Sequence, residues 1–205
     1  FGPQLKIVAN MAMGFDNINV DEAKKRGIMV TNTPDVLTES VAEHAIALMF
    51  AIARRIVESD QFMRDGKYMS WAPMLFLGND LVGKILGLVG LGRIGAAVAK
   101  RMHDGFEMKI IYYDVKRNEE LEKQYHLEYR DLENLLKESD FVSIHVPLLE
   151  TTRHLIGEPQ LKIMKKTAYL INTSRGPVID EKALVAALKS GEIKGAALDV
   201  FEFEP

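Results

Sequence analysis

The sequence predicts an α/β fold built on a doubly wound parallel sheet, together with the remnant of a second, smaller domain. From residue 85 onward, short continuous apolar runs alternate with segments of helical period, which is typical of parallel strands covered by helices on both faces. A glycine-rich turn follows the first of these runs. The remnant is indicated by a strand-like run that begins as early as Leu5, with almost nothing before it.

The regular part of the chain supplies the elements of this sheet. The apolar runs predict strands at residues 85–89, 109–113, 141–146, 169–172 and 196–200, with a weaker one near 126–128. The segments between them predict helices at residues 93–102, 119–125, 132–139, 160–165 and 181–189. Asp180 is expected to cap the last of these helices.

The beginning of the chain follows a different pattern. Residues 5–9 and 28–30 predict short strands, and the helix between them is expected to start at Asn19, with Glu22 three residues on, and to end at Gly27. Ser40 and Glu43 form a second capping-box pattern, which predicts a long apolar helix that runs through residue 55 and beyond. Residues 66–80 are expected to form a loop. We therefore divide the chain into residues 1–33 and residues 34–205.

The composition excludes several classes of protein. The 205 residues hold 26 Lys and Arg against 29 Asp and Glu, a net charge of −3, which argues against a nucleic-acid partner. The chain has no cysteine, which excludes disulfides and thiolate metal sites, and we predict no metal site. The longest apolar run, residues 45–53, is too short to cross a bilayer, so we expect no membrane partner. A cytoplasmic globular protein remains as the expectation.

Gly90, Gly92 and Gly95 form a G-x-G-x-x-G pattern between a predicted strand and a predicted helix. In that context the first glycine permits a tight turn, the second lets the backbone approach a pyrophosphate, and the third lets the helix pack closely on the strand. The backbone N–H groups of Arg93 and Ile94 would then face the phosphates at the helix N-terminus. A turn that is rich in glycine for packing alone is the alternative, and the context favours dinucleotide binding.

Asp114 ends the next predicted strand, and its offset from Gly95 (114 − 95 = 19) is close to the spacing of about 20 that places a carboxylate on the adenosine ribose. Such a carboxylate accepts hydrogen bonds from the ribose hydroxyls and repels a 2′-phosphate, which favours NAD. Lys116 and Arg117 follow closely and keep NADP open. Another adenosine cofactor, such as S-adenosylmethionine, would also use Asp114 and stays as a further alternative.

Ligands of doubly wound sheets bind at the carboxyl ends of strands, and His145, Arg175 and Asp199 lie at three predicted ends. The planar guanidinium of Arg175, beside Gly176, can fork onto a carboxylate or polarise a carbonyl. The alternative for Arg175 is a salt bridge at the rim of the sheet. His145 is expected to be structural because it ends a buried strand, and we assign no chemistry to the other histidines.

Long stretches of the chain resemble the D-isomer-specific 2-hydroxyacid dehydrogenases, most closely their glyoxylate/hydroxypyruvate reductase and 2-ketogluconate reductase branch. These stretches are NMAMGFDNINVDEAKKRGIMVTNTP, VAEHAIALMFAIARR, WAPMLFLG, GLVGLGRIG, HVPL, INTSRG and ALDVFEFEP. The resemblance implies an NAD-dependent oxidoreductase that transfers a hydride between NAD(H) and a small 2-keto or 2-hydroxy acid. It also implies a substrate domain, of which residues 1–33 are a remnant, and an NAD-binding domain, residues 34–205, through which the family forms homodimers.

The resemblance also implies roles for the residues that match the family's motifs. Arg175 matches the catalytic Arg that binds the substrate carboxylate and keto oxygen, and Glu204 matches the Glu that pairs with the catalytic His. The backbone N–H groups at Met13 and Gly14 match the clamp on the substrate carboxylate. Besides the three glycines, the cofactor contacts carried over are Arg93, Ile94, Asp114, Val146, Pro147, Thr152, Thr173, Ser174 and Asp199.

The sequence departs from the family in two respects. The family's catalytic His lies downstream of the E-x-P stretch, and none of the five histidines here takes that place, so we expect the chain, truncated at both ends, to be inactive in isolation. Glu107 stands where a glycine is usual. The alternative function is that of a dinucleotide-sensing interaction protein, like the corepressors that resemble this family, and the WAPMLFLG stretch disfavours it.

Overall fold

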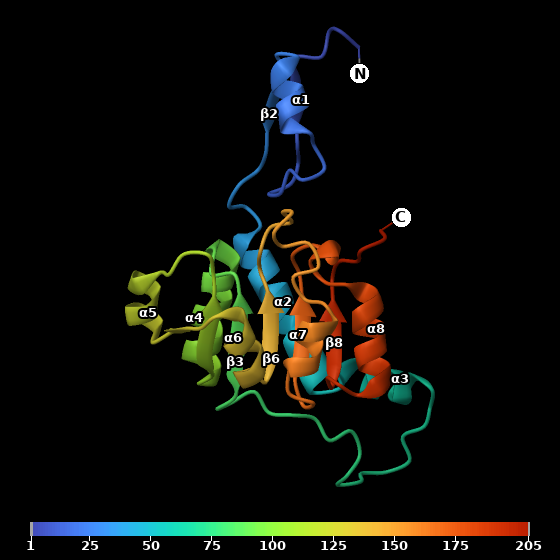
Figure 1. Cartoon of the computed structure of the whole chain (residues 1–205). Helices are drawn as coiled ribbons and strands as arrows, with labels where there is room; N and C mark the ends of the chain where they lie inside the picture. Colours follow the sequence, from blue (N-terminus) through green and yellow to red (C-terminus); the bar gives the residue numbers. More distant parts are fainter. Residues whose placement is uncertain (1, 205) are drawn as a thin grey trace.

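The computed structural model describes residues 2–204, which fold around two separate parallel sheets (Figure 1). The small sheet pairs β1 (Ile7–Ala9) with β2 (Met29–Thr31), and α1 (Val20–Lys25) connects the two strands. This small part projects from one end of a larger part that is built on a six-stranded sheet (Figure 1).

All neighbouring strands of the large sheet are parallel, in the order β5-β4-β3-β6-β7-β8. The chain enters this sheet at β3, extends it through β4 and β5 on one side, and then adds β6, β7 and β8 on the other. The reversal between β3 and β6 opens a crevice at the carboxyl ends of the strands, so the predicted doubly wound fold is confirmed. The strands are β3 (Ile85–Val89), β4 (Lys109–Tyr113), β5 (Glu128–Tyr129), β6 (Phe141–Ile144), β7 (Tyr169–Asn172) and β8 (Gly195–Leu198).

Helices cover both faces of the large sheet, and a buried apolar cluster lies under each set. One cluster joins α2, α4 and α5 to the sheet and includes the fully buried Met49 and Met102. The other joins α6, α7 and α8 to the opposite face and includes Leu135 and Leu184. The helices are α2 (Thr38–Ala53), α3 (Ile56–Arg64), α4 (Arg93–Phe106), α5 (Glu119–Tyr125), α6 (Leu132–Glu138), α7 (Glu158–Ile163), the 3-10 turn η1 (Gly176–Val178) and α8 (Glu181–Ser190).

The bounds of α2 differ from the prediction at both ends. The helix begins at Thr38 without a side-chain cap, so Ser40 lies inside its first turn and the predicted Ser40–Glu43 capping box is wrong. The helix ends at Ala53 and does not run through residue 55, because Arg55 adopts a left-handed backbone conformation (φ 55°) and starts α3 as a separate helix. Burial of the apolar face of α2 against the sheet fixes this helix in the absence of a capping side chain.

The remaining predicted elements are present, with bounds that shift by a few residues. The Asn19 side chain accepts a hydrogen bond of 2.9 Å from the N–H of Glu22, and the Asp180 side chain accepts one of 3.1 Å from Ala183, as their predicted capping roles require. No helix or strand lies between α3 and β3, which agrees with the loop predicted there. Among residues 2–204, no helix is long and apolar enough to span a membrane.

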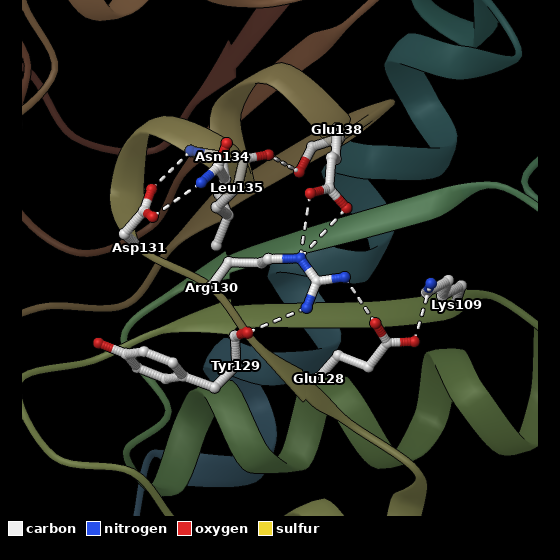
Figure 2. A network of polar contacts seen from close by, with 9 residues as sticks. Lys109, Glu128, Tyr129, Arg130, Asp131, Asn134, Leu135 and Glu138 are labelled. Atoms are coloured by element: carbon white, nitrogen blue, oxygen red, sulfur yellow. Dashed lines mark hydrogen bonds and ion pairs between the residues drawn. The ribbon is translucent and has the colours of Figure 1, made fainter.

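A polar network holds the short edge strand β5 against the rest of the sheet (Figure 2). The Arg130 guanidinium pairs with Glu138 on α6 at 3.0 Å and with Glu128 on β5 at 2.6 Å, and Glu128 also pairs with Lys109 on β4 at 2.8 Å. Hydrogen bonds from Lys109 and then from Arg130 hold the pKa of Glu128 below its usual range. A strand of two residues forms few backbone hydrogen bonds, so these side chains supply much of its attachment.

Candidate functional site

The glycine-rich turn lies between β3 and α4, beside the reversal point of the sheet. Gly90 has a left-handed backbone (φ 100°), which favours glycine, and a Cβ on Gly95 would lie 2.3 Å from the carbonyl oxygen of Gly90. A Cβ on Gly92, by contrast, would meet nothing within 4 Å, so the backbone there is open to a ligand. The geometry therefore fits the three predicted roles: Gly90 permits the tight turn, Gly92 leaves the backbone open to a pyrophosphate, and Gly95 allows close packing of α4. The first N–H groups of α4, at Arg93 and Ile94, follow directly.

Asp114 stands at the carboxyl end of β4, next to this turn. Its Oδ2 accepts a hydrogen bond of 2.8 Å from the backbone N–H of Leu91, and its Oδ1 lies 3.5 Å from the backbone nitrogen of Lys116. The hydrogen bond from Leu91 fixes the orientation of the carboxylate. The other oxygen, Oδ1, has only the 3.5 Å contact with Lys116 and can accept a further hydrogen bond. This arrangement suits a carboxylate that accepts hydrogen bonds from ribose hydroxyls.

The two cations after Asp114 differ in their surroundings. Arg117 donates to both carboxylate oxygens of Glu122 on α5, at 3.1 and 2.7 Å, and its guanidinium carbon lies over the ring of Tyr129, 5.4 Å from the ring centroid. Glu122 also accepts a hydrogen bond of 2.6 Å from the Tyr112 hydroxyl. Arg117 lowers the pKa of Glu122, and burial raises the pKa of Tyr112 to about 12. The guanidinium that could bind a 2′-phosphate is therefore engaged elsewhere, whereas Lys116 is exposed.

The loop after β6 carries three of the predicted cofactor contacts, Val146, Pro147 and Thr152. The Thr152 hydroxyl donates to the carbonyl oxygen of Pro147 at 2.7 Å and accepts from the N–H of Leu149 at 2.8 Å, which closes the loop on itself. His145, just before the loop, lies 2.9 Å from the Ser143 hydroxyl, and burial lowers its pKa to about 4. A neutral, hydrogen-bonded histidine fits the predicted structural role.

The turn after β7 contains Thr173, whose buried Oγ1 has no hydrogen-bond partner among the described residues, as is also true of Thr38 Oγ1 at the start of α2. Ser174 beside it is engaged, because its backbone N–H and its hydroxyl both donate to Asn172 Oδ1, at 3.0 and 2.9 Å. A buried hydroxyl without a partner costs free energy unless a ligand satisfies it. Thr173 therefore fits the predicted position near a nicotinamide, and the open backbone at Gly92 fits the predicted approach of a dinucleotide.

Arg175 lies where the large and small parts of the molecule meet. Its guanidinium pairs with Asp16, which precedes α1, through contacts of 3.0 and 3.1 Å from Nε and 3.0 Å from Nη2. A Cβ on Gly14 would lie 1.9 Å from Nη2, so the guanidinium rests against the backbone of residue 14. The structure thus brings together Arg175 and the Met13–Gly14 segment, which the resemblance to the family assigns to one substrate site.

The C-terminal segment folds back over the Arg175 turn. A Cβ on Gly176 would lie 1.9 Å from the carbonyl carbon of Phe201, so this crossing requires glycine. Glu204, the predicted partner of a catalytic histidine, accepts a hydrogen bond of 3.0 Å from the N–H of Phe201 and forms no ion pair with Arg175 within residues 2–204. In the same C-terminal segment, Oε1 of Glu202 lies 2.7 Å from Nε2 of His154.

Two residues near these sites were not predicted from the sequence. Asp16 forms an ion pair with Arg175. Nε2 of His44, on α2, lies 3.2 Å from Oδ1 of Asp199, the residue predicted to lie near the nicotinamide. The position of Asp16, two residues after Gly14, was the one local signal available. Nothing in the sequence indicated that His44 reaches the end of β8.

Fold and site together are those of a dinucleotide-binding protein: a doubly wound sheet with a glycine turn at its reversal point and a carboxylate at the end of the next strand. Residues 46–205 match the family model described as "D-isomer specific 2-hydroxyacid dehydrogenase, NAD binding domain", and the chain belongs to this family. The predictions of the family and of an NAD-binding domain are therefore confirmed. S-adenosylmethionine as the cofactor and a corepressor-like function find no support.

Similar proteins agree with this assignment. The chain is 61% identical to a glyoxylate reductase of Korarchaeum cryptofilum and 58% identical to one of Thermococcus litoralis, over 99% of its own length. It spans 61% and 62% of these two relatives. Among solved structures, the TT0316 protein of Thermus thermophilus superposes with a TM-score of 0.91 at 45% identity, covering 98% of this chain and 62% of that one. A D-lactate dehydrogenase of Aquifex aeolicus, complexed with NAD and lactic acid, gives 0.88 at 40% identity, covering 98% and 59%.

Proposed function

We propose that the protein reduces a small 2-keto acid of the glyoxylate type to the 2-hydroxy acid, with NADH as the reductant. The observation that carries this proposal is the contact between the Arg175 guanidinium and the backbone of Gly14, beside the crevice of the sheet. A guanidinium next to backbone N–H donors suits the carboxylate of a keto acid. The two relatives named as glyoxylate reductases, at 61% and 58% identity, support this class of substrate.

The chain's own residues would bind the substrate and stabilise charge. Arg175 binds the carboxylate and polarises the keto oxygen, while the N–H groups of Met13 and Gly14 bind the carboxylate from the other side. A fixed positive charge beside an oxygen that becomes negative lowers the energy of the transition state. Glu204 is proposed to pair with the proton-donating histidine of the family and to keep it protonated.

The cofactor would lie along the carboxyl ends of β3, β4, β6 and β7, where it supplies the hydride for the keto carbon. The N–H groups of Arg93 and Ile94 hold the phosphates, and Asp114 holds the adenosine ribose. The negative charge of Asp114 and the engagement of Arg117 by Glu122 favour NAD over NADP. The remaining proposed contacts are Gly90, Gly92, Gly95, Val146, Pro147, Thr152, Thr173, Ser174 and Asp199.

Steady-state kinetics on the full-length protein test this function directly. NADH oxidation is followed by absorbance with glyoxylate, hydroxypyruvate, pyruvate and larger 2-keto acids. We expect turnover with the small acids, and Arg175→Ala is expected to lower kcat/KM by about a thousandfold. Arg26→Ala serves as the control, because Arg26 is exposed at the end of α1 and pairs only with Glu22 of that helix among the described residues. The absence of turnover with every acid of the panel overturns the proposal.

We also propose that residues 34–205 form the NAD-binding domain and residues 1–33 a remnant of the substrate domain. This division is supported by the two sheets, because no strand of the small sheet pairs with a strand of the large one in the part of the chain that the structure describes. The cytoplasm is the proposed location, which the absence of cysteine fits, since disulfides do not persist there.

A homodimer formed through residues 56–77 completes the proposal. This segment leaves the body of the large part after α2 (Figure 1). Its exposed apolar side chains include Val57 (72%), Met69 (90%), Trp71 (78%) and Met74 (76%). A concentration of exposed apolar side chains of this kind marks an interface with another protein, and a second copy of the chain presents the same surface.

Light scattering during size-exclusion chromatography tests the dimer. The wild-type protein is expected to elute with twice the mass of one chain, and the double variant Trp71→Ser/Met74→Ser with the mass of one. Val115→Ser is the control, because Val115 is 95% exposed but lies outside this segment, after β4. A monomeric wild-type protein contradicts the dimer without affecting the proposed activity.

A further inference from the structure

We propose that Asp16 is a positioning residue for Arg175: it binds one edge of the guanidinium and thereby presents the other edge to the substrate carboxylate. The inference rests on the proposed function and adds to it a second residue on which recognition of the keto acid depends. It is carried by the contacts between these two side chains and by the way the backbone around Gly14 is held.

The contacts of Arg175 divide its donors into two sets. A guanidinium has five N–H donors in one plane. Asp16 accepts from Nε at 3.0 and 3.1 Å and pairs with Nη2 at 3.0 Å, and the carbonyl oxygen of Ser174 accepts from Nη1 at 2.7 Å. One N–H on Nη1 and one on Nη2 remain. Two parallel donors on neighbouring nitrogens match two adjacent oxygens, here one oxygen of the carboxylate and the keto oxygen of a 2-keto acid.

The backbone beside Arg175 is held in a matching orientation. Asn32 donates to the carbonyl oxygen of Met13 at 2.9 Å, and Asn10 donates to that of Gly14 at 2.8 Å. Because N–H and C=O point in opposite directions across a trans peptide, the N–H groups of Gly14 and Phe15 face away from these two asparagines. The missing side chain of Gly14 leaves the space in which Nη2 lies. Asp16 therefore anchors the guanidinium on a segment whose donors are already oriented.

The ion pair itself contributes little to the stability of the fold. The side chains of Arg175 and Asp16 are 36% and 35% exposed, and exposed ion pairs are a minor source of stability because water and salt screen them. Loss of this ion pair would therefore change the stability of the fold only slightly. A misplaced Arg175 guanidinium, by contrast, would strongly weaken substrate binding. This difference allows positioning to be separated from folding.

Asp16→Asn in the full-length protein tests the inference. The amide keeps a similar shape but turns an acceptor oxygen into a donor that opposes Nε–H. We expect kcat/KM for glyoxylate to fall by about tenfold to a hundredfold, through a higher KM as well as a lower kcat, because the guanidinium is no longer oriented. NADH affinity, measured by fluorescence titration, and the melting temperature are expected to stay unchanged. Asp16→Glu, which keeps the charge, is expected to recover part of the activity.

Asp21→Asn is the matched control, because Asp21 lies on the same small part of the molecule but is exposed in the first turn of α1. Its kinetics are expected to equal those of the wild type. If Asp16→Asn keeps the wild-type kcat/KM, or if it loses activity only together with NADH binding and thermal stability, the positioning role is overturned while the proposed function stands. If the wild-type protein itself reduces no 2-keto acid, the proposed function fails, and the role of Asp16 with it.

Discussion

The Oδ2 atom of Asp114 accepts a hydrogen bond of 2.8 Å from the backbone N–H of Leu91. This contact joins the carboxylate at the end of β4 to the glycine-rich turn after β3, so the proposed ribose site and the proposed phosphate site have a fixed relative position. A rigid, preformed pair of sites lowers the cost of ordering a long cofactor.

Asp114→Asn separates the charge of this residue from its structural contact. The amide oxygen can still accept from Leu91, but the group loses the charge that strengthens its hydrogen bonds to ribose hydroxyls. We expect the Kd for NADH to rise about tenfold, and the Kd for NADPH to fall relative to it because a repulsive charge is removed. Fluorescence titrations with both cofactors measure this, and an unchanged ratio of the two Kd values contradicts the role of Asp114.

Glu122→Gln is expected to widen cofactor use toward NADPH. The substitution removes the charge that holds Arg117 at 2.7 Å, so the guanidinium gains freedom to reach a 2′-phosphate near Asp114. We expect the Kd for NADPH to fall about threefold to tenfold while that for NADH stays the same. Glu120→Gln is the control, since Glu120 is exposed on the same helix. Equal NADPH affinity in all three proteins would show that Arg117 does not reach the cofactor.

Gly95→Ala and Gly105→Ala form a matched pair within α4. A Cβ on Gly95 would lie 2.3 Å from the carbonyl oxygen of Gly90, whereas one on Gly105 would meet nothing within 4 Å. We expect the first substitution to lower the free energy of unfolding by about 1–3 kcal/mol, and the second to raise it by about 0.5–1 kcal/mol through helix propensity. Chemical denaturation measures both, and a neutral Gly95→Ala argues against close packing at the turn.

Glu107→Gly is expected to stabilise the protein. Glu107 ends α4 with a left-handed backbone (φ 51°), a conformation that glycine adopts without strain. The gain is expected to be about 0.5–1 kcal/mol, because the relief of strain exceeds the added freedom of the unfolded chain. Thermal unfolding checks it, with Glu120→Gly inside α5 as a control that is expected to destabilise. A lower melting temperature for Glu107→Gly would contradict the assignment.

His145 makes stability depend on pH in the acidic range. Its pKa is lowered to about 4 by burial, against about 6.5 in the unfolded chain, so between these values the unfolded state binds more protons. Stability therefore falls as the pH drops from about 6.5 toward 4, by on the order of 1–2 kcal/mol at about pH 5. Denaturation midpoints at several pH values are compared with those of His145→Asn. An equal pH dependence in both proteins would contradict this account.

The sequence alone predicted the elements that are encoded locally. The strands β3, β4 and β7 have the predicted bounds, and the caps at Asn19 and Asp180 form as expected, because each cap depends on a side chain within three residues of the backbone group that it satisfies. The start of α2 was predicted wrongly: the helix begins at Thr38, two residues before Ser40, and Glu39 in its first turn pairs with Arg101 on α4, a contact between distant segments. For the site, the glycine turn and Asp114 followed from spacing along one strand–turn–helix unit.

What only the tertiary structure decided is which partners the charged side chains find. Arg175 and Asp16 are 159 residues apart, and no pattern in the sequence indicates that they meet. The same is true of His44 with Asp199. The sequence by itself determined the class of fold and the place of the cofactor turn, because backbone conformation and burial periodicity are local properties. The geometry around Arg175 depends on how two parts of the molecule, each built on its own sheet, approach each other, which is fixed by packing between distant segments.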